Sequence, residues 1–160
     1  MPLSKKLLSR SNLRLSRTLR KDQTERSSWS SSIGTGLSWS FPTGVLSTDI
    51  TYRDVRSDSF RIANESLTLG LGWRHAKPIL GVRLSARASF EDKTFDNPFF
   101  GATEVRKDTS TRASIRMVFS EFDLYGFSPN LEITYSNTDS NVGLFTTEDT
   151  GFQFGIQSSF

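Results

Sequence analysis

The stretch Ser66–Arg74 reads Ser-Leu-Thr-Leu-Gly-Leu-Gly-Trp-Arg and alternates strictly in polarity. Leucine or tryptophan occupies every odd position from 67 to 73, and Ser, Thr, Gly or Arg occupies every even position from 66 to 74. A period of two residues is typical of a β-strand with two chemically different faces. This stretch therefore predicts a strand with one apolar and one polar face.

The same alternation recurs along the chain, and no segment has a convincing helical period. Seven further segments carry it: Asn12–Arg20, Trp29–Ser40, Val45–Arg53, Leu80–Glu91, Asp108–Ser120, Leu131–Ser136 and Phe152–Phe160. We expect about eight strands of about 9–11 residues, the length with which a tilted strand crosses a bilayer. The predicted fold class is all-β, an antiparallel up-and-down transmembrane β-barrel spanning residues 1–160, either complete or the C-terminal part of a larger barrel.

The connections between these segments are predicted to alternate in length. Three are compact and contain Gly or Pro: Phe41–Gly44, His75–Pro78 and Glu121–Pro129. Four are longer and more polar: Lys21–Ser28, Asp54–Glu65, Asp92–Lys107 and Asn137–Asp149. Outer-membrane barrels have short periplasmic turns and long external loops, so this pattern favours such a barrel with its C-terminus in the periplasm.

Composition excludes several other classes. Hydrophobic residues make up 35% of the 160 residues, and no run approaches the roughly 18 apolar residues of a membrane helix. The net charge of +3 is too small to indicate nucleic-acid binding. The chain contains no cysteine, which excludes disulfides, thiolate metal sites and a cysteine nucleophile.

The N-terminal region lacks the features of a secretory signal. Residues 1–28 are basic and polar, with no run of about 7–15 apolar residues. An outer-membrane protein needs such a signal, so either the chain is a fragment of a longer exported protein or the barrel interpretation is wrong. Residues 1–11 are expected to be disordered or the remnant of an upstream strand.

The polar faces of the predicted strands carry a basic stripe that we expect to face the barrel lumen. Its members are Arg14, Arg83, Arg87, Arg112 and Arg116. Asp49 and Glu132 are candidate ion-pair partners. We favour a structural role, in which interior charges pair across neighbouring strands, over an anion-selective lining. Aromatic residues lie near strand ends, where the interfacial girdles of barrels are found: Trp29, Trp39, Trp73, Phe90, Phe119 and Tyr135.

No catalytic, cofactor or metal site is predicted. His75 is the only histidine and is expected to be a solvated residue of a periplasmic turn, so no catalytic triad is available. The acidic and amide residues of Asn137–Asp149 lack the ligand spacing of a calcium loop. The segment Asp96–Gly101 is apolar for an external loop; it is expected to plug the lumen, to bind a partner or to pack on the barrel rim.

The C-terminal strand carries aromatic and aliphatic residues at alternate positions, Phe152, Phe154 and Ile156, and the chain ends at Phe160. This pattern resembles the signal through which the barrel-assembly machinery binds outer-membrane proteins by strand addition. We therefore predict that machinery and outer-membrane lipid as partners.

A family resemblance lies in the last third of the chain. Gly126, Pro129 and Leu131 form a Gly-x-x-Pro-x-Leu pattern, and Ser140-Asn141 follows before the final strand. These residues resemble the C-terminal barrel of the surface lipoprotein assembly modifier family. The resemblance implies a non-enzymatic role in translocating lipoproteins to the cell surface. Members combine periplasmic tetratricopeptide repeats with a barrel of about 14 strands, so the resemblance implies that this chain supplies only part of the barrel.

Two alternatives stay open from sequence. The first is a small autonomous outer-membrane barrel with a porin-like or structural role. The second is a soluble all-β binding module, in which the apolar faces would pack against each other in a core.

Overall fold

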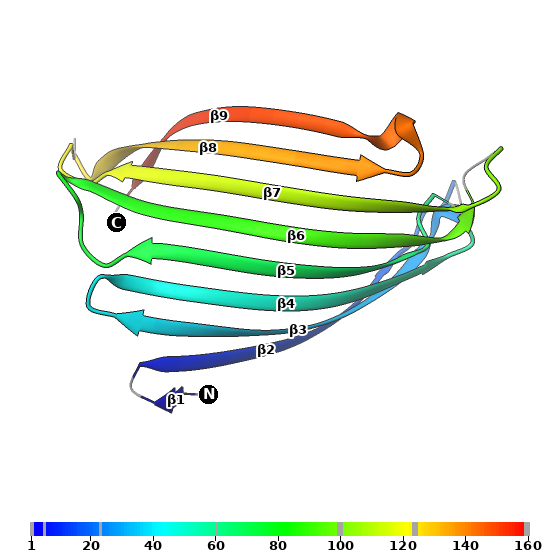
Figure 1. Cartoon of the computed structure of the whole chain (residues 1–160), viewed down its shortest axis with the longest axis horizontal. Helices are drawn as coiled ribbons and strands as arrows, with labels where there is room; N and C mark the ends of the chain where they lie inside the picture. The colour runs from blue at the N-terminus through cyan, green and yellow to red at the C-terminus, as the bar shows by residue number, and fades with distance from the viewer. Residues whose placement is uncertain are drawn as a thin grey trace.

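The computed structural model describes residues 2–4, 6–22, 24–59, 61–98, 101–122 and 125–158. Within these residues the chain forms a single antiparallel sheet whose nine strands pair in sequence order (Figure 1). The strands are β1 (Pro2–Ser4), β2 (Leu7–Thr18), β3 (Ser28–Phe41), β4 (Gly44–Ser57), β5 (Asn64–His75), β6 (Val82–Pro98), β7 (Val105–Phe119), β8 (Phe127–Ser140) and β9 (Thr147–Ser158). Two single-turn 3-10 helices, η1 (Thr24–Arg26) and η2 (Gly143–Phe145), lie in the connections at one end.

The all-β, antiparallel, up-and-down prediction is confirmed. Each of the eight predicted segments corresponds to one of the strands β2 to β9, in the predicted order. Residues 7–11 form the start of β2, and the short β1 pairs with β2 through Pro2 and Ser4. None of the helices among the described residues has the length and hydropathy of a membrane span.

The predicted strand lengths were wrong, and so was the contrast between short and long connections. Strands β2 to β9 contain 12 to 17 residues each. The segments expected as loops continue the ladders: β6 runs to Pro98, and β8 runs to Ser140. Polar side chains suggested loops there, but the backbone can remain paired beyond the level at which the side chains stop being apolar, because ladder hydrogen bonds do not depend on side-chain polarity.

The sheet is open within the described residues. β9 forms one edge, and β1 with β2 forms the other, and no pairing joins them (Figure 1). β1 covers only the first residues of β2, at Leu7 and Leu8. The closure expected for a barrel is therefore not part of the described structure.

The two faces of the sheet differ in packing as well as in polarity. The polar face is crowded: a Cβ added at Gly34 would lie 2.8 Å from Asn12 Oδ1 and 2.8 Å from Thr51 Oγ1. A Cβ at Gly70 would lie 2.5 Å from the Asp49 carboxylate oxygens. Small residues on this face allow the sheet to curve toward it, so the polar face is concave and the apolar face convex.

Burial is inverted relative to a soluble protein. The buried side chains of the strands include Ser66, Asp108, Ser110 and Asn130, all on the concave face. Among the described residues, the buried hydrophobic ones are Val55, Ala63 and Phe95, which lie at the end of the sheet that carries η1 and η2. We call this the loop end, and the opposite end, with the hairpins at 42–43, 76–81 and 120–126, the turn end.

Candidate functional site

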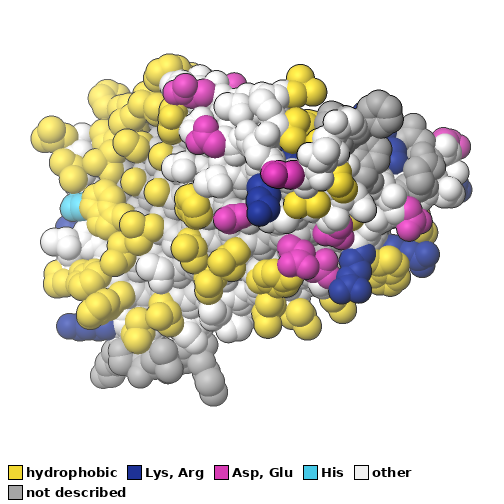
Figure 2. All heavy atoms as spheres, turned by 45° about the vertical axis from the view of Figure 1, so that its right-hand side comes forward, with side chains coloured by type: hydrophobic (Ala, Val, Ile, Leu, Met, Phe, Trp, Pro, Cys, Tyr) yellow, Lys and Arg dark blue, Asp and Glu magenta, His cyan; other side chains and the backbone are white. Residues whose placement is uncertain are grey.

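The convex face carries a belt of exposed apolar side chains that crosses every long strand. Figure 2 shows hydrophobic side chains gathered over one part of the visible surface and charged groups toward the other. On the edge strands Leu13 is 70% exposed and Phe154 74%, and on the interior strand β5 Leu71 is still 50% exposed. So extensive an apolar surface marks a contact with protein or lipid.

The boundary of this belt toward the loop end runs obliquely across the sheet. With the isolated Pro98 and Val105 at the loop-end tips of β6 and β7 left aside, the last apolar outward residue on each strand from β3 to β9 is, in order, Trp29, Tyr52, Leu67, Phe90, Ala113, Tyr135 and Phe152. Tyr52 lies opposite Ile33, which is four positions closer to the turn end than Trp29 on β3. Following the register pairs across the sheet places Phe152 on the row of Trp39, which is ten positions closer to the turn end than Trp29. From each strand to the next, the boundary residue either stays on the same register row or moves toward the turn end.

The slope of this boundary gives the angle between the strands and the belt. Ten positions at about 3.3 Å each, over six strand spacings of about 4.8 Å, correspond to a tilt of about 50°. On β3 the belt extends from Trp29 to Phe41; that length is about 40 Å along the strand and about 26 Å when projected at this tilt. Transmembrane barrel strands tilt by about 35–45° and carry an apolar band about 25 Å tall.

The five predicted arginines all lie on the concave face. Arg87 Nη2 contacts Asp49 Oδ1 at 2.9 Å, and Arg112 Nη1 contacts Glu91 Oε2 at 2.9 Å. Arg116 Nη2 donates to Gln157 Oε1 at 3.3 Å and lies directly opposite Glu132 in the register. Arg14 and Arg83 make no ion pair with the residues that the structure describes. The concave face therefore carries both arginines that form ion pairs and arginines that form none with the described residues.

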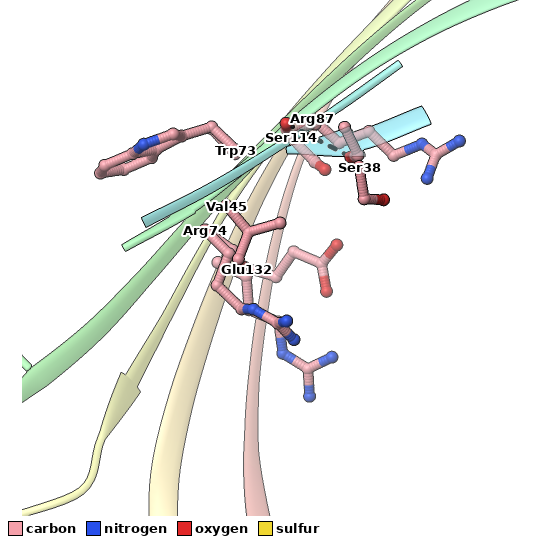
Figure 3. A pocket seen from close by; sticks show the side chains of 12 residues that line it. Ser38, Val45, Trp73, Arg74, Arg87, Ser114 and Glu132 are labelled. Carbon is pink, nitrogen blue, oxygen red and sulfur yellow. Dashed lines mark hydrogen bonds between the residues drawn. The ribbon is translucent and has the colours of Figure 1, made fainter. Parts of the chain in front are cut away.

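A groove of about 340 Å³ opens among these arginines near the turn end. Ser38, Ser47, Ser85 and Ser114 provide much of its polar lining. Figure 3 shows Arg74, Arg87 and Glu132 reaching to one side of the sheet, while Trp73 points to the other. The groove is thus a polar, predominantly basic surface, and it can bind anionic groups.

At the loop end the structure contains a cluster that the sequence did not predict. Arg106 pairs with Asp108, and their side chains are only 17% and 7% exposed. The Arg106 guanidinium carbon lies 4.4 Å from the ring centre of Phe95 and 3.3 Å from that of Phe145. This ion pair, in contact with two rings and shielded from solvent, holds the β8–β9 connection, through Phe145, against the loop-end parts of β6 and β7. The sequence signal was Arg-x-Asp, which places both residues on one face of a strand.

The family-motif residues of the β8–β9 connection have a structural role. Asn141 Oδ1 accepts a hydrogen bond from Lys107 N at 2.8 Å, and Asn141 Nδ2 donates to Val105 O at 2.9 Å. Ser140 Oγ accepts from Val142 N at 3.2 Å. The two Asn141 bonds attach the start of the connection to the first residues of β7, and the Ser140 bond lies within the connection itself.

The remaining motif residues lie at the turn end. Gly126 has φ +82°, in the left-handed region that glycine adopts without strain. Pro129 pairs with Ile156 and Leu131 with Phe154, on the convex face of β8 and β9. The structure thus brings Leu131 beside the C-terminal pattern.

The C-terminal pattern lies on an edge strand. Phe152, Phe154 and Ile156 project from β9 on the convex face and are 73–74% exposed. Phe160 lies outside the described residues.

The other residues weighed from sequence lie apart from the groove. His75 ends β5, and its Nδ1 lies 2.6 Å from Lys77 O in the following turn. In the segment 96–101, residues 96–98 extend β6; Phe99 and Phe100 are outside the described residues. Across the described parts of the chain, no group of three or more His, Cys, Asp or Glu side chains is placed to hold a metal ion.

The fold and its faces define an up-and-down antiparallel β-protein with an apolar convex face and a charged concave face. The chain belongs to the surface lipoprotein assembly modifier family, whose model matches residues 4–157. The match covers nearly the whole chain and not only the last third, where the sequence motifs lie. No curated protein and no solved structure was found to match.

Proposed function

We propose that this chain is an outer-membrane β-barrel segment of a surface-lipoprotein assembly factor and that it acts without catalysis. The family supports the role in surface lipoprotein assembly. The single observation that carries the membrane placement is the oblique apolar belt. A planar slab of lipid that crosses tilted strands requires such a slope, whereas a soluble core imposes no planar boundary on the outside of a sheet.

The open edges support a partnership with further strands. In hydrocarbon, unpaired N–H and C=O groups cost several kcal/mol each, so an inserted sheet must close. The outer edges of β2 and β9 therefore pair with each other or with strands from the rest of a larger barrel. The exposed apolar residues of β9 are the proposed contact for the barrel-assembly machinery.

Refolding into lipid tests the membrane placement. We expect the denatured chain, diluted into phosphatidylcholine vesicles, to float with them in a density gradient and to resist extraction by carbonate. Boiled and unboiled samples should migrate differently in gels if the barrel closes. Recovery of a monomeric, β-rich protein from water without vesicles or detergent would contradict the placement.

A cellular measurement tests the assembly role. Deleting the gene in its native host should lower the surface-exposed fraction of at least one lipoprotein while its total amount stays constant. Protease shaving of intact cells, compared with lysed cells, measures that fraction. An unchanged exposed fraction for every lipoprotein of the host would refute the assembly role and leave the membrane placement intact.

A further inference from the structure

Four arginines alternate between two neighbouring strands on the concave face. From the turn end they are Arg83 on β6, Arg116 on β7, Arg87 on β6 and Arg112 on β7. The register places Arg116 opposite Ser85, Arg87 opposite Ser114 and Arg112 opposite Ser89. We call these four residues the arginine ladder. Each of its last three rows pairs an arginine with a serine, which leaves room for the guanidinium to extend over the sheet.

The spacing of the ladder is that of an extended peptide. Successive rows on one face of a sheet are about 6.7 Å apart, so the four guanidinium groups span about 20 Å. Alternate side chains of an extended peptide repeat with the same distance. A single phosphate or carboxylate would meet only one or two of these groups.

The ladder is held in place but not neutralised. Asp49 and Glu91 each contact one arginine, yet the side chains of Arg87 and Arg112 remain 61% and 51% exposed. Arg83 makes no ion pair with any described residue. Because a guanidinium has five donors, the bound carboxylates leave donors free for a second anion.

The groove runs beside the turn-end part of this ladder, and its lining includes Arg74, Arg87 and Arg116, four serines and one carboxylate, that of Glu132. Serine hydroxyls can hydrogen-bond a peptide backbone. The aromatic residue of the lining, Trp73, points to the other side of the sheet (Figure 3), so it offers no ring on which a base could stack. This composition favours an acidic peptide over a single-stranded nucleic acid.

We propose that the arginine ladder binds an extended peptide segment with acidic residues at alternate positions. The inference rests on the proposed function only in identifying that segment as part of a surface lipoprotein in transit. Each Arg–carboxylate contact is solvent-exposed and individually weak, which suits transient binding of a passing chain.

Peptide binding to the refolded protein in zwitterionic detergent tests the proposal. The probe is a fluorescent peptide of alternating glutamate and serine, and the comparison peptide has the same composition in two separate blocks. We expect the alternating peptide to bind more tightly and to weaken with added salt. Arg83→Gln should weaken its binding about threefold and Arg83→Gln/Arg116→Gln about tenfold, with Arg17→Gln on the convex face without effect.

Each other outcome overturns the proposal. Equal binding of the two peptides would show that the spacing of the acidic residues does not affect affinity. Unchanged binding in the double variant would show that the arginine ladder is not the binding site. Tighter binding of an oligothymidylate than of the alternating peptide would assign the ladder to nucleic acid. Circular dichroism of every variant establishes that it has folded. Failure of peptide binding in a protein that inserts into vesicles leaves the proposed function standing, whereas peptide binding by a protein that stays in water overturns only the membrane placement.

Discussion

At the scale of single residues, the described chain contains two non-glycine residues with positive φ, Leu80 at 49° and Tyr125 at 55°. Each precedes a left-handed glycine, Gly81 or Gly126, in a hairpin at the turn end. Leu80 is 93% exposed, so its side chain gains little burial to offset the strained backbone.

Leu80→Gly is therefore expected to stabilise the protein. Relief of the left-handed strain should raise the free energy of unfolding by about 1 kcal/mol, measured by chemical denaturation in detergent. Leu144→Gly is the matched control, because Leu144 is also exposed, at 77%, but has an ordinary backbone; it should be neutral or slightly destabilising. A loss of stability in Leu80→Gly would show that the side chain makes a contact that offsets the strain.

Asn141 gives a second prediction at this scale. Asn141→Ala removes both side-chain hydrogen bonds to the backbone of residues 105 and 107. We expect a loss of about 1–2 kcal/mol and faster proteolysis of the β8–β9 connection. Asn97→Ala removes an exposed amide without a hydrogen bond among the described residues and should change stability by less than about 0.5 kcal/mol. Equal effects in both variants would argue against the attachment of the loop through Asn141.

At the scale of strands, glycine on the concave face makes space for the charged side chains. Gly70 on β5 lies opposite Asp49 on β4, whose carboxylate pairs with Arg87. This arrangement leaves no room for a Cβ at position 70.

Gly70→Ala should cost about 1–3 kcal/mol, because the new methyl group displaces the Asp49 carboxylate from its ion pair. In the background of Asp49→Ala the same substitution should cost much less, and this double-mutant cycle isolates the contact. Gly143→Ala, where the space is open, serves as the control. A cost that persists without the Asp49 carboxylate would assign the effect to the backbone of β5.

At the scale of the whole molecule, the oblique belt separates positions that share a register row. Ile33 and Thr109 lie on one row, through Tyr52, Leu67 and Asp92, and both project from the convex face. Ile33 is inside the belt on β3, whereas Thr109 on β7 lies beyond its boundary.

Ile33→Arg should therefore destabilise the protein in phosphatidylcholine vesicles by about 2–3 kcal/mol, and Thr109→Arg by no more than about 1 kcal/mol. Denaturant titration of vesicle-bound protein measures both. In detergent micelles, which adapt to the protein surface, the difference should shrink. Equal costs in vesicles would mean that the belt does not follow a flat bilayer.

The sequence by itself determined which face of each strand is apolar and which is polar, the succession of strands along the chain, and the family resemblance. Alternation is a local property of each strand, so Leu67 and Leu71 share a face whatever lies beside them. The motif around Pro129 and Asn141 is likewise contained within a short stretch. These features needed no knowledge of strand pairing.

Only the tertiary structure decided how the strands align, because register depends on pairings between residues far apart in the chain. Register placed Phe152 on the row of Trp39 and so revealed the slope of the belt. It also set Arg116 and Arg87 in successive rows of one face, and the fold brought Arg106 into contact with both Phe95 and Phe145. Segments such as 92–98 were mistaken for loops because polarity reports where a strand leaves an apolar environment, whereas backbone pairing decides where the strand ends.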